Sequence, residues 1–169
     1  MLTIGVDLGG TKVEMVLLDG SGSVVKSQRY ATRSEDGPDR VVAGVAESAT
    51  KLLREAGQPV HALGVGVAGQ VEKDTGAVSF APNLGWRNVP LRESLQEALD
   101  MPVAVANDVR AATWGEWQYG AGRGVNDLVC LFIGTGVGGG IVAPGYLGPL
   151  DDSRQPGHPS HPGDAPAGS

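Results

Sequence analysis

Two glycine-rich segments, far apart in the sequence, most strongly constrain how this chain can fold. They are residues 9–12 and residues 134–140. Each lies between two apolar runs of β-forming residues, namely 2–6, 13–18, 128–133 and 141–143. A glycine-rich segment between two such runs is typical of a β-hairpin. Because glycines let backbone N–H groups approach an anion closely, we expect two hairpin tips that grip a nucleotide's phosphates from two sides.

The rest of the chain up to residue 143 alternates between strand and helix patterns. We expect strands over residues 2–8, 13–18, 24–30, 60–68 and 102–106, with a small hairpin formed by 71–72 and 77–80. We expect helices over residues 38–56, 91–99 and 108–119. This alternation predicts an α/β fold. Helix 38–56 has apolar residues at helical spacing and supplies the crossover that parallel strands need.

Composition excludes several classes of partner and compartment. The 169 residues fit one domain, or one domain and part of another. The net charge of −6 and the absence of a basic block argue against nucleic acid and against an anionic membrane surface. With no signal peptide and no apolar stretch that could span a bilayer, we expect a cytoplasmic protein. The single cysteine, Cys130, lies in an apolar run and is expected to be a buried small hydrophobe.

The character of the sequence changes after Pro144. Residues 145–169 are rich in Gly, Pro, Ser, Asp and His, with almost no apolar residue beyond Leu150. We expect this tail to lack regular structure, because it cannot bury enough surface to offset chain entropy. His158 and His161 lie here, and nothing around them would fix the geometry of a metal site.

Asp7 is the first candidate for chemistry, because it ends a strand just before the first glycine-rich turn. A carboxylate there could hold Mg²⁺, directly or through water, while Gly9, Gly10 and Thr11 meet phosphate oxygens and Lys12 adds a positive charge. The segment is not the Walker A pattern. An ordinary hairpin tip with solvated ends is therefore the alternative.

The second glycine-rich segment has five glycines in seven positions. This is more than a structural turn needs, since each glycine costs backbone entropy. We expect phosphate oxygens to meet the hydroxyl of Thr135 and the backbone of four neighbours, which are Gly134, Gly136, Gly138 and Gly139. A flexible linker is disfavoured, because apolar strands flank the segment closely.

Asn107 and Asp108 follow the strand 102–106 and open the third helix. Both residue types cap helices well, so a cap is the simplest interpretation. Ligands in open α/β sheets, however, bind beyond the carboxyl ends of strands, and Asp7 lies at another such end. Asp108 could therefore accept a proton from a hydroxyl group as phosphate transfers to it.

Three further residues each allow a functional and a structural interpretation. Asn83 precedes Leu84-Gly85-Trp86 in a polar and aromatic loop, where an amide and a ring could orient a sugar; a capped turn is an equal alternative. Trp114 and Trp117 are three residues apart on the third helix and so share a face. Core packing is expected for both.

Taken together, these segments resemble the ROK family of sugar kinases, especially bacterial glucokinases. The likeness covers residues 2–143. It rests on Asp7-Leu8-Gly9-Gly10-Thr11-Lys12, Ala81-Pro82-Asn83-Leu84-Gly85-Trp86, Asn107-Asp108-Val109-Arg110-Ala111-Ala112 and Gly134-Thr135-Gly136-Val137-Gly138-Gly139-Gly140. The resemblance implies a two-lobed, actin-like ATPase fold of the ribonuclease H type, with ATP and Mg²⁺ as cosubstrates. It also implies a hexose acceptor, with glucose converted to glucose 6-phosphate.

The resemblance also implies roles for individual residues. Asp108 would be the general base, and Asn107 and Asn83 would hold sugar hydroxyls. Residues 9–12 would form the first phosphate loop, and Thr135 with its neighbouring glycines the second.

The chain departs from the family in its last part. The family's Glu-x-x-Gly-His-type segment and its cysteine-rich zinc motif are missing, as is the adenine-binding part of the second lobe. We therefore expect a first lobe over 1–125, the first hairpin of a second lobe over 126–143 and an atypical tail over 144–169. Such a truncated chain should have little activity alone, and a full-length relative could form a homodimer.

Two alternatives stay open beside the kinase. One is a remnant that binds a sugar or phosphate without turnover, which the missing lobe favours. The other is a ROK-type transcriptional regulator that lacks its DNA-binding module. The acidic charge balance and the strand that starts at residue 2 argue against the regulator.

Overall fold

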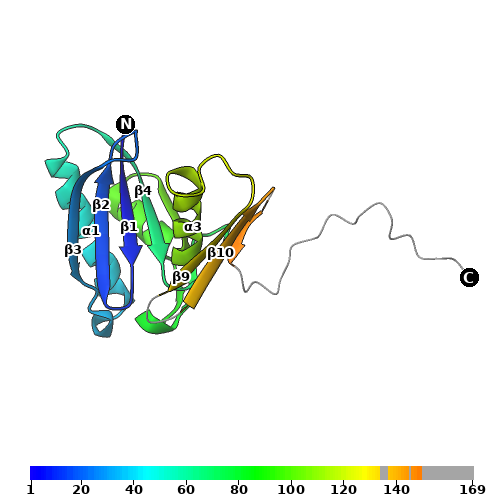
Figure 1. Cartoon of the computed structure of the whole chain (residues 1–169). Helices are drawn as coiled ribbons and strands as arrows, with labels where there is room; N and C mark the ends of the chain where they lie inside the picture. Colours follow the sequence, from blue (N-terminus) through cyan, green and yellow to red (C-terminus); the bar gives the residue numbers. More distant parts are fainter. Residues whose placement is uncertain (134–136, 145, 150–169) are drawn as a thin grey trace, which may run out of the picture.

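A five-stranded mixed sheet forms the centre of the larger part of the molecule (Figure 1). The computed structural model describes residues 1–133, 137–144 and 146–149. The strand order is β3-β2-β1-β4-β8. The strands span Leu2–Leu8 (β1), Lys12–Leu18 (β2), Val24–Ala31 (β3), Val60–Val67 (β4) and Val103–Asn107 (β8). The first three form an antiparallel meander, and β4 and β8 add in parallel beside β1. The predicted α/β fold is confirmed.

Helices cover both faces of this sheet (Figure 1). Helix α1 (Pro38–Glu55) begins with a proline at its first turn and makes the crossover from β3 to β4. It buries an apolar stripe that includes Val41, Val45 and Leu52. Helix α2 (Leu91–Leu99) packs beside α1, and α3 (Asp108–Gln118) packs against β4 and β8. The three predicted helices are confirmed to within one residue at each end.

A second, smaller sheet connects β4 to α2. It contains β5 (Gln70–Val71), β6 (Val78–Ala81) and β7 (Trp86–Val89), in that order. Two short 3₁₀ helices lie nearby, η1 (Ser34–Asp36) and η2 (Pro82–Leu84). Strand β7 was not predicted, because only its two ends, Trp86 and Val89, are buried. The expectation that the Trp86 ring packs on a sugar is not supported, since this side chain is 1 % exposed and belongs to the core.

A third sheet lies against the far side of α3 (Figure 1). Its order is β11-β10-β9, formed by Leu128–Ile133 (β9), Val137–Ala143 (β10) and Tyr146–Pro149 (β11). Helix α3 thus has a sheet on each of two sides. The expected hairpin of β9 and β10 is confirmed as an antiparallel pair.

The third sheet corrects two expectations. Gly138 and Gly139 do not lie in the turn but within β10, opposite Phe132 and Leu131 of β9. Strand β11 contradicts the expectation that the chain has no regular structure from residue 145 onward. Its residues pair with β10 through backbone hydrogen bonds, and the amino-acid composition of a segment carries no information about such bonds. Residues 150–169, with His158 and His161, lie outside the described residues.

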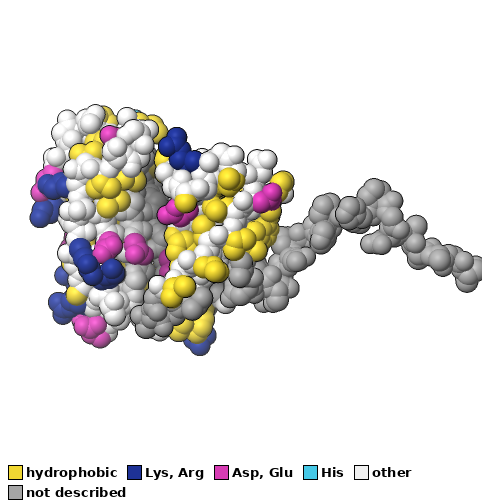
Figure 2. All heavy atoms as spheres, in the orientation of Figure 1, with side chains coloured by type: hydrophobic (Ala, Val, Ile, Leu, Met, Phe, Trp, Pro, Cys, Tyr) yellow, Lys and Arg dark blue, Asp and Glu magenta, His cyan; other side chains and the backbone are white. Residues whose placement is uncertain are grey.

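The outer face of β9 is apolar and exposed. Val129, Leu131 and Ile133 alternate with partly buried residues that face α3. Figure 2 shows hydrophobic side chains gathered over β9 and β10, whereas charged side chains are scattered over the part of the molecule that holds the five-stranded sheet. Trp114 is also exposed and meets Tyr119 edge to face at 6.0 Å between ring centroids. Core packing was therefore the wrong expectation for Trp114, and Cys130 is only partly buried.

Candidate functional site

The candidate site lies where β1, β4 and β8 reach their carboxyl ends. Asp7 of β1 pairs with Gly66 of β4, and Gly66 pairs with Ala106 of β8, just before Asn107 and Asp108. A Cβ built on Gly66 would lie 3.5 Å from the Asp108 Cα atom. Gly66 thus lies between the strand that carries Asp7 and the start of α3, which carries Asp108. The structure brings Asp7 and Asp108 to one edge of the sheet, as the strand-end rule predicts.

Asn107 fixes the position of Asp108. Its Oδ1 atom accepts a hydrogen bond from the Arg110 N–H at 3.1 Å, which makes it the N-cap of α3. Its Nδ2 group donates to Asp108 Oδ1 at 2.9 Å and to the Gly69 carbonyl at 3.1 Å. Asp108 Oδ1 also accepts from the Val109 N–H at 2.8 Å. Within the described residues Asp108 Oδ2 accepts no hydrogen bond, so this oxygen is available to a ligand.

Asp7 lies in an unfavourable electrostatic setting. Partial burial of its carboxyl group raises its pKa above the usual value, and the negative charges of Asp108 and Glu14 raise it further. Lys12 opposes this shift more weakly. Glu14 pairs directly across the hairpin from Asp7. Two neighbouring negative charges therefore act on Asp7, and one of them, Glu14, is already paired with Lys12.

The first glycine-rich segment forms the predicted hairpin tip between β1 and β2. The Gly9 N–H donates to the Lys12 carbonyl at 3.0 Å and closes the turn. Within the described residues, the N–H groups of Gly10 and Thr11 donate no hydrogen bond. The ammonium group of Lys12 lies 3.0 Å from Glu14 Oε1, and Arg29 approaches the same oxygen. The positive charge of Lys12 is thus shared with Glu14 in this structure.

Asn83 reaches the same place from η2. A Cβ built on Gly10 would lie 2.6 Å from the Asn83 carbonyl oxygen and 2.8 Å from its Cβ atom. The turn and η2 are therefore in close contact, which brings the predicted sugar residue beside the predicted phosphate turn. The Asn83 side chain is exposed.

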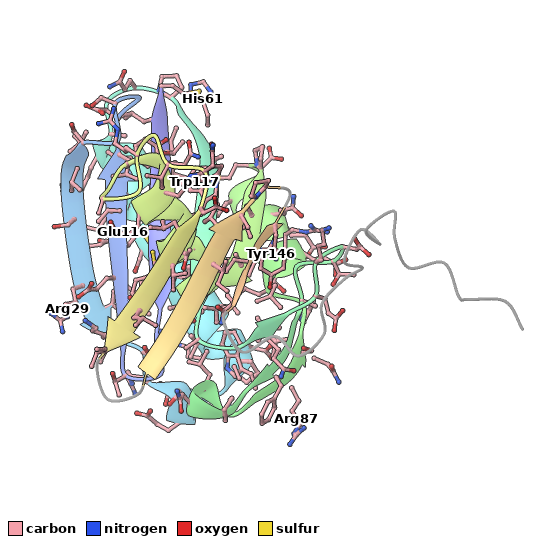
Figure 3. All side chains as sticks on the ribbon, turned by 45° about the vertical axis from the view of Figure 1, so that its right-hand side comes forward. Arg29, His61, Arg87, Glu116, Trp117 and Tyr146 are labelled. Atoms are coloured by element: carbon pink, nitrogen blue, oxygen red, sulfur yellow. The ribbon has the colours of Figure 1, made fainter. Side chains whose placement is uncertain are left out.

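The second glycine-rich segment is described only in part. Gly134, Thr135 and Gly136 lie outside the described residues. Strand β9 ends, and β10 begins, at the end of the molecule where β1 turns into β2 (Figures 1 and 3). Gly138 and Gly140 also have a packing role. A Cβ at Gly138 would lie 2.9 Å from Val109 Cγ2, and one at Gly140 would lie 2.8 Å from Thr113 Cβ.

Sequence reasoning missed three residues of the site. Glu14 has no signal of its own within its strand, although its position opposite Asp7 follows from the hairpin register. The Gly69 carbonyl accepts a hydrogen bond from the Asn107 side-chain amide, and the Thr32 hydroxyl, just after β3, donates one to the Gly9 carbonyl in the first turn. No sequence pattern signals these last two contacts, because each joins segments more than twenty residues apart.

Other features of the described residues lie apart from the site. His61, at the start of β4, is at the opposite end of the molecule from Arg87 of β7 (Figure 3). No group of three His, Cys, Asp or Glu side chains in the described ranges could hold a metal ion. Among the same residues, no helix is long and apolar enough to cross a membrane.

Comparison with known proteins identifies the family. The ROK family model matches residues 3–148. The chain belongs to the ROK family. The crystal structure of a ROK family glucokinase from Streptomyces griseus, in complex with glucose and AMPPNP, superposes with a TM-score of 0.79 at 38% identity. That match covers 87% of this chain and 46% of the other. The structural neighbours confirm the expected actin-like ATPase fold.

The curated relatives include kinases and repressors. Glucokinase from Streptomyces coelicolor is 40% identical over 141 residues, which is 83% of this chain and 43% of the relative. The xylose repressor from Caldicellulosiruptor bescii is 35% identical over 148 residues, covering 85% of this chain and 37% of the relative. The chain thus spans less than half the length of these relatives.

Proposed function

We propose that this chain forms the sugar-binding side of an ATP-dependent hexose kinase, with glucose as the substrate and glucose 6-phosphate as the product. The arrangement of Asp108 carries the proposal. One oxygen of this carboxylate is held by two hydrogen bonds, and the other is available at the edge where the phosphate turn lies. The similarity to glucokinases, one of them bound to glucose and AMPPNP, supports glucose and ATP.

Asp108 acts as the general base in this proposal. It accepts the proton of a sugar hydroxyl as that oxygen attacks the terminal phosphorus of ATP, and ADP leaves. Asn107 holds Asp108 Oδ1 with its Nδ2 group. Its own Oδ1 atom accepts one hydrogen bond, from the Arg110 N–H, and has one remaining lone pair to accept from a second sugar hydroxyl. Asn83, exposed on η2, holds another hydroxyl.

Asp7 and the first turn serve the nucleotide in this proposal. Mg²⁺ prefers oxygen ligands and keeps several waters. The Asp7 carboxylate, close to Asp108 and Glu14, therefore fits this ion through a water molecule. The phosphate oxygens meet the N–H groups of Gly10 and Thr11, whereas the Gly9 N–H closes the turn on the Lys12 carbonyl and does not contact the phosphates as expected. Lys12 and the second glycine-rich segment, with Thr135, also contact the phosphates. We further propose a cytoplasmic location and a homodimer for a full-length relative.

We propose little turnover for the chain alone. Phosphoryl transfer needs both sides of a cleft to position the groups, and this chain spans less than half of its kinase relatives. Binding of a sugar or phosphate without turnover is the second candidate, favoured by this coverage and by the similarity to xylose repressors. A glucose-dependent assay of ADP production distinguishes the two, because weak but measurable turnover by the purified chain would exclude the second candidate, whereas binding without any turnover would favour it.

The role of Asp108 is tested in a chimera. Residues 1–148 are fused to the C-terminal part of the Streptomyces coelicolor glucokinase that this chain does not match. We expect Asp108→Asn to lower kcat by roughly 100- to 10,000-fold, because the amide cannot accept the proton. Glucose affinity, measured by calorimetry, should change little. Asp100→Asn is the control, since Asn tolerates its left-handed backbone.

The cap alternative makes the opposite prediction for this variant. Asn caps a helix about as well as Asp. If Asp108 only stabilised the start of α3, the folded Asp108→Asn chimera would keep a kcat close to that of the parent. Such a result would remove Asp108 from the catalytic role while leaving the family assignment intact.

A further inference from the structure

Thr32 is one of two buried polar side chains among the described residues, together with Thr113. The Thr113 hydroxyl donates to the Val109 carbonyl within its own helix. The Thr32 hydroxyl instead donates to the Gly9 carbonyl at 2.6 Å, across 23 residues of sequence. Thr32 is 4 % exposed and follows the last residue of β3. The buried Thr32 hydroxyl thus holds the turn between β1 and β2 from outside that pair of strands, which indicates that the turn needs a fixed shape.

The backbone of Thr32 holds the other end of the same turn. Its N–H donates to the Thr11 carbonyl at 3.0 Å. Both carbonyl groups that flank the Gly9-Gly10-Thr11 tip therefore point toward Thr32. The C=O and the following N–H of one planar peptide unit point in opposite directions. With the Gly9 carbonyl directed at Thr32, the Gly10 N–H is directed away from it, and no described residue accepts that N–H.

Among the described residues, the Thr32 hydroxyl is the one hydrogen-bond partner of this peptide unit. Glycine flanks it on both sides, and glycine crosses between backbone regions at low cost. A rotated Gly9–Gly10 peptide would turn the carbonyl oxygen, instead of the N–H, toward a bound phosphate and repel it. We propose that Thr32 is the positioning residue of the first phosphate turn. This inference rests on the proposed function, because it assigns the anion at Gly10 to a phosphoryl group.

The sugar side of the site contacts this turn through η2 and not through the Thr32 hydroxyl. The chain continues from Thr32 into η1, which contacts η2, and η2 carries Asn83 against Gly10. Thr32 acts on the orientation of one peptide unit, and neither its hydroxyl nor its backbone N–H is free to touch a ligand. Removing the hydroxyl should therefore weaken phosphate binding and leave sugar binding unchanged.

The test uses the full chain, labelled with ¹⁵N, and follows amide NMR signals as magnesium pyrophosphate or glucose is added. Thr32→Val keeps the shape of the side chain and removes the donor, while Thr32→Ser keeps the donor. We expect Thr32→Val to weaken pyrophosphate binding by roughly 10-fold or more, about one hydrogen bond to a charged group. It should also shift the Gly10 amide signal before any ligand is added. Thr32→Ser should stay close to the parent in both measurements.

Thr113→Val is the matched control, since it removes the other buried hydroxyl without touching the turn. Circular dichroism checks that each variant is folded. If Thr32→Val binds pyrophosphate as the parent does, or if Thr32→Ser fails to restore binding, the positioning role is wrong and the proposed function stands. If the parent chain binds no pyrophosphate at all, the phosphate role of the turn fails, and the role of Thr32 fails with it.

Discussion

The contact between Gly10 and Asn83 makes Gly10→Ala the sharpest test of how the site is built. The added Cβ would lie 2.6 Å from the Asn83 carbonyl oxygen and 2.8 Å from its Cβ atom. Neither atom can rotate away, because both are fixed by the backbone of η2. Gly10 does not have a positive φ angle, so alanine would meet no backbone penalty here. The whole effect should come from the lack of space.

We expect Gly10→Ala to lower the free energy of unfolding by about 1–3 kcal/mol, the usual cost of overpacking. The assay is urea unfolding at neutral pH, followed by tryptophan fluorescence, with the buried Trp86 as the main reporter. The slope against urea should not change, because the variant exposes the same surface on unfolding. The melting temperature should fall by about 2–4 °C for each kcal/mol.

Gly44→Ala is the matched control for this measurement. Gly44 lies inside α1, where an added Cβ would meet nothing within 4 Å. Alanine favours a helix interior over glycine by about 1 kcal/mol, so this variant should be as stable as the parent or more so. If Gly10→Ala unfolded within about 0.5 kcal/mol of the parent, the packing of the turn against η2 would be refuted.

Two further predictions concern charge and packing. Folding raises the pKa of the Asp7 carboxyl group, so the folded state binds the proton of this group more tightly than the unfolded state does. That stabilisation is lost as pH rises through the raised pKa. In urea titrations, the free energy of unfolding of Asp7→Asn should match that of the parent near pH 3 and exceed it at pH 7. Leu63→Ala should lower the free energy of unfolding by about 2–5 kcal/mol, since the Leu63 side chain is 1 % exposed. Leu131→Ala should change it by no more than about 0.5 kcal/mol, since Leu131 is 61 % exposed. Calorimetry measures both variants.

The elements that could be predicted from the sequence are those with a strong local signal. Helix α2 and strand β9 have the expected bounds, and α1 begins at its predicted proline. Strand β7 had no such signal. It is four residues long, with Arg87 and Asn88 between its buried ends, and Asn88 has a positive φ. Its pairing with β6 is decided by the rest of the fold.

The glycines of β10 show why composition misled at two points. Five glycines in seven residues predict a turn, because glycine is disfavoured in strands. Gly138 and Gly140 instead lie in a strand where α3 approaches too closely for any Cβ. Similarly, the polar composition of residues 145–169 hid β11, whose partner β10 supplies the backbone bonds. Both errors concern neighbours that a local window of sequence does not contain.

The site itself could be predicted only in part, for the same reason. Asp7 and Asp108 were found because strand ends meet at one edge, which is a rule of the fold class. Thr32 and Gly69 could not be found, since their roles depend on contacts that only the folded chain makes. A residue that binds a ligand is often visible from its chemistry, whereas a residue that positions it is visible only from its neighbours.

Asn107 shows that the structural and functional interpretations of a motif need not compete. The sequence left a helix cap and a ligand site as alternatives for Asn107 and Asp108. In the structure, Asn107 uses Oδ1 to cap α3 and Nδ2 to hold the Asp108 carboxylate and Gly69. The cap determines where α3 begins, and the start of α3 determines where Asp108 lies. A well-made cap at the carboxyl end of β8 is therefore part of what positions the proposed base.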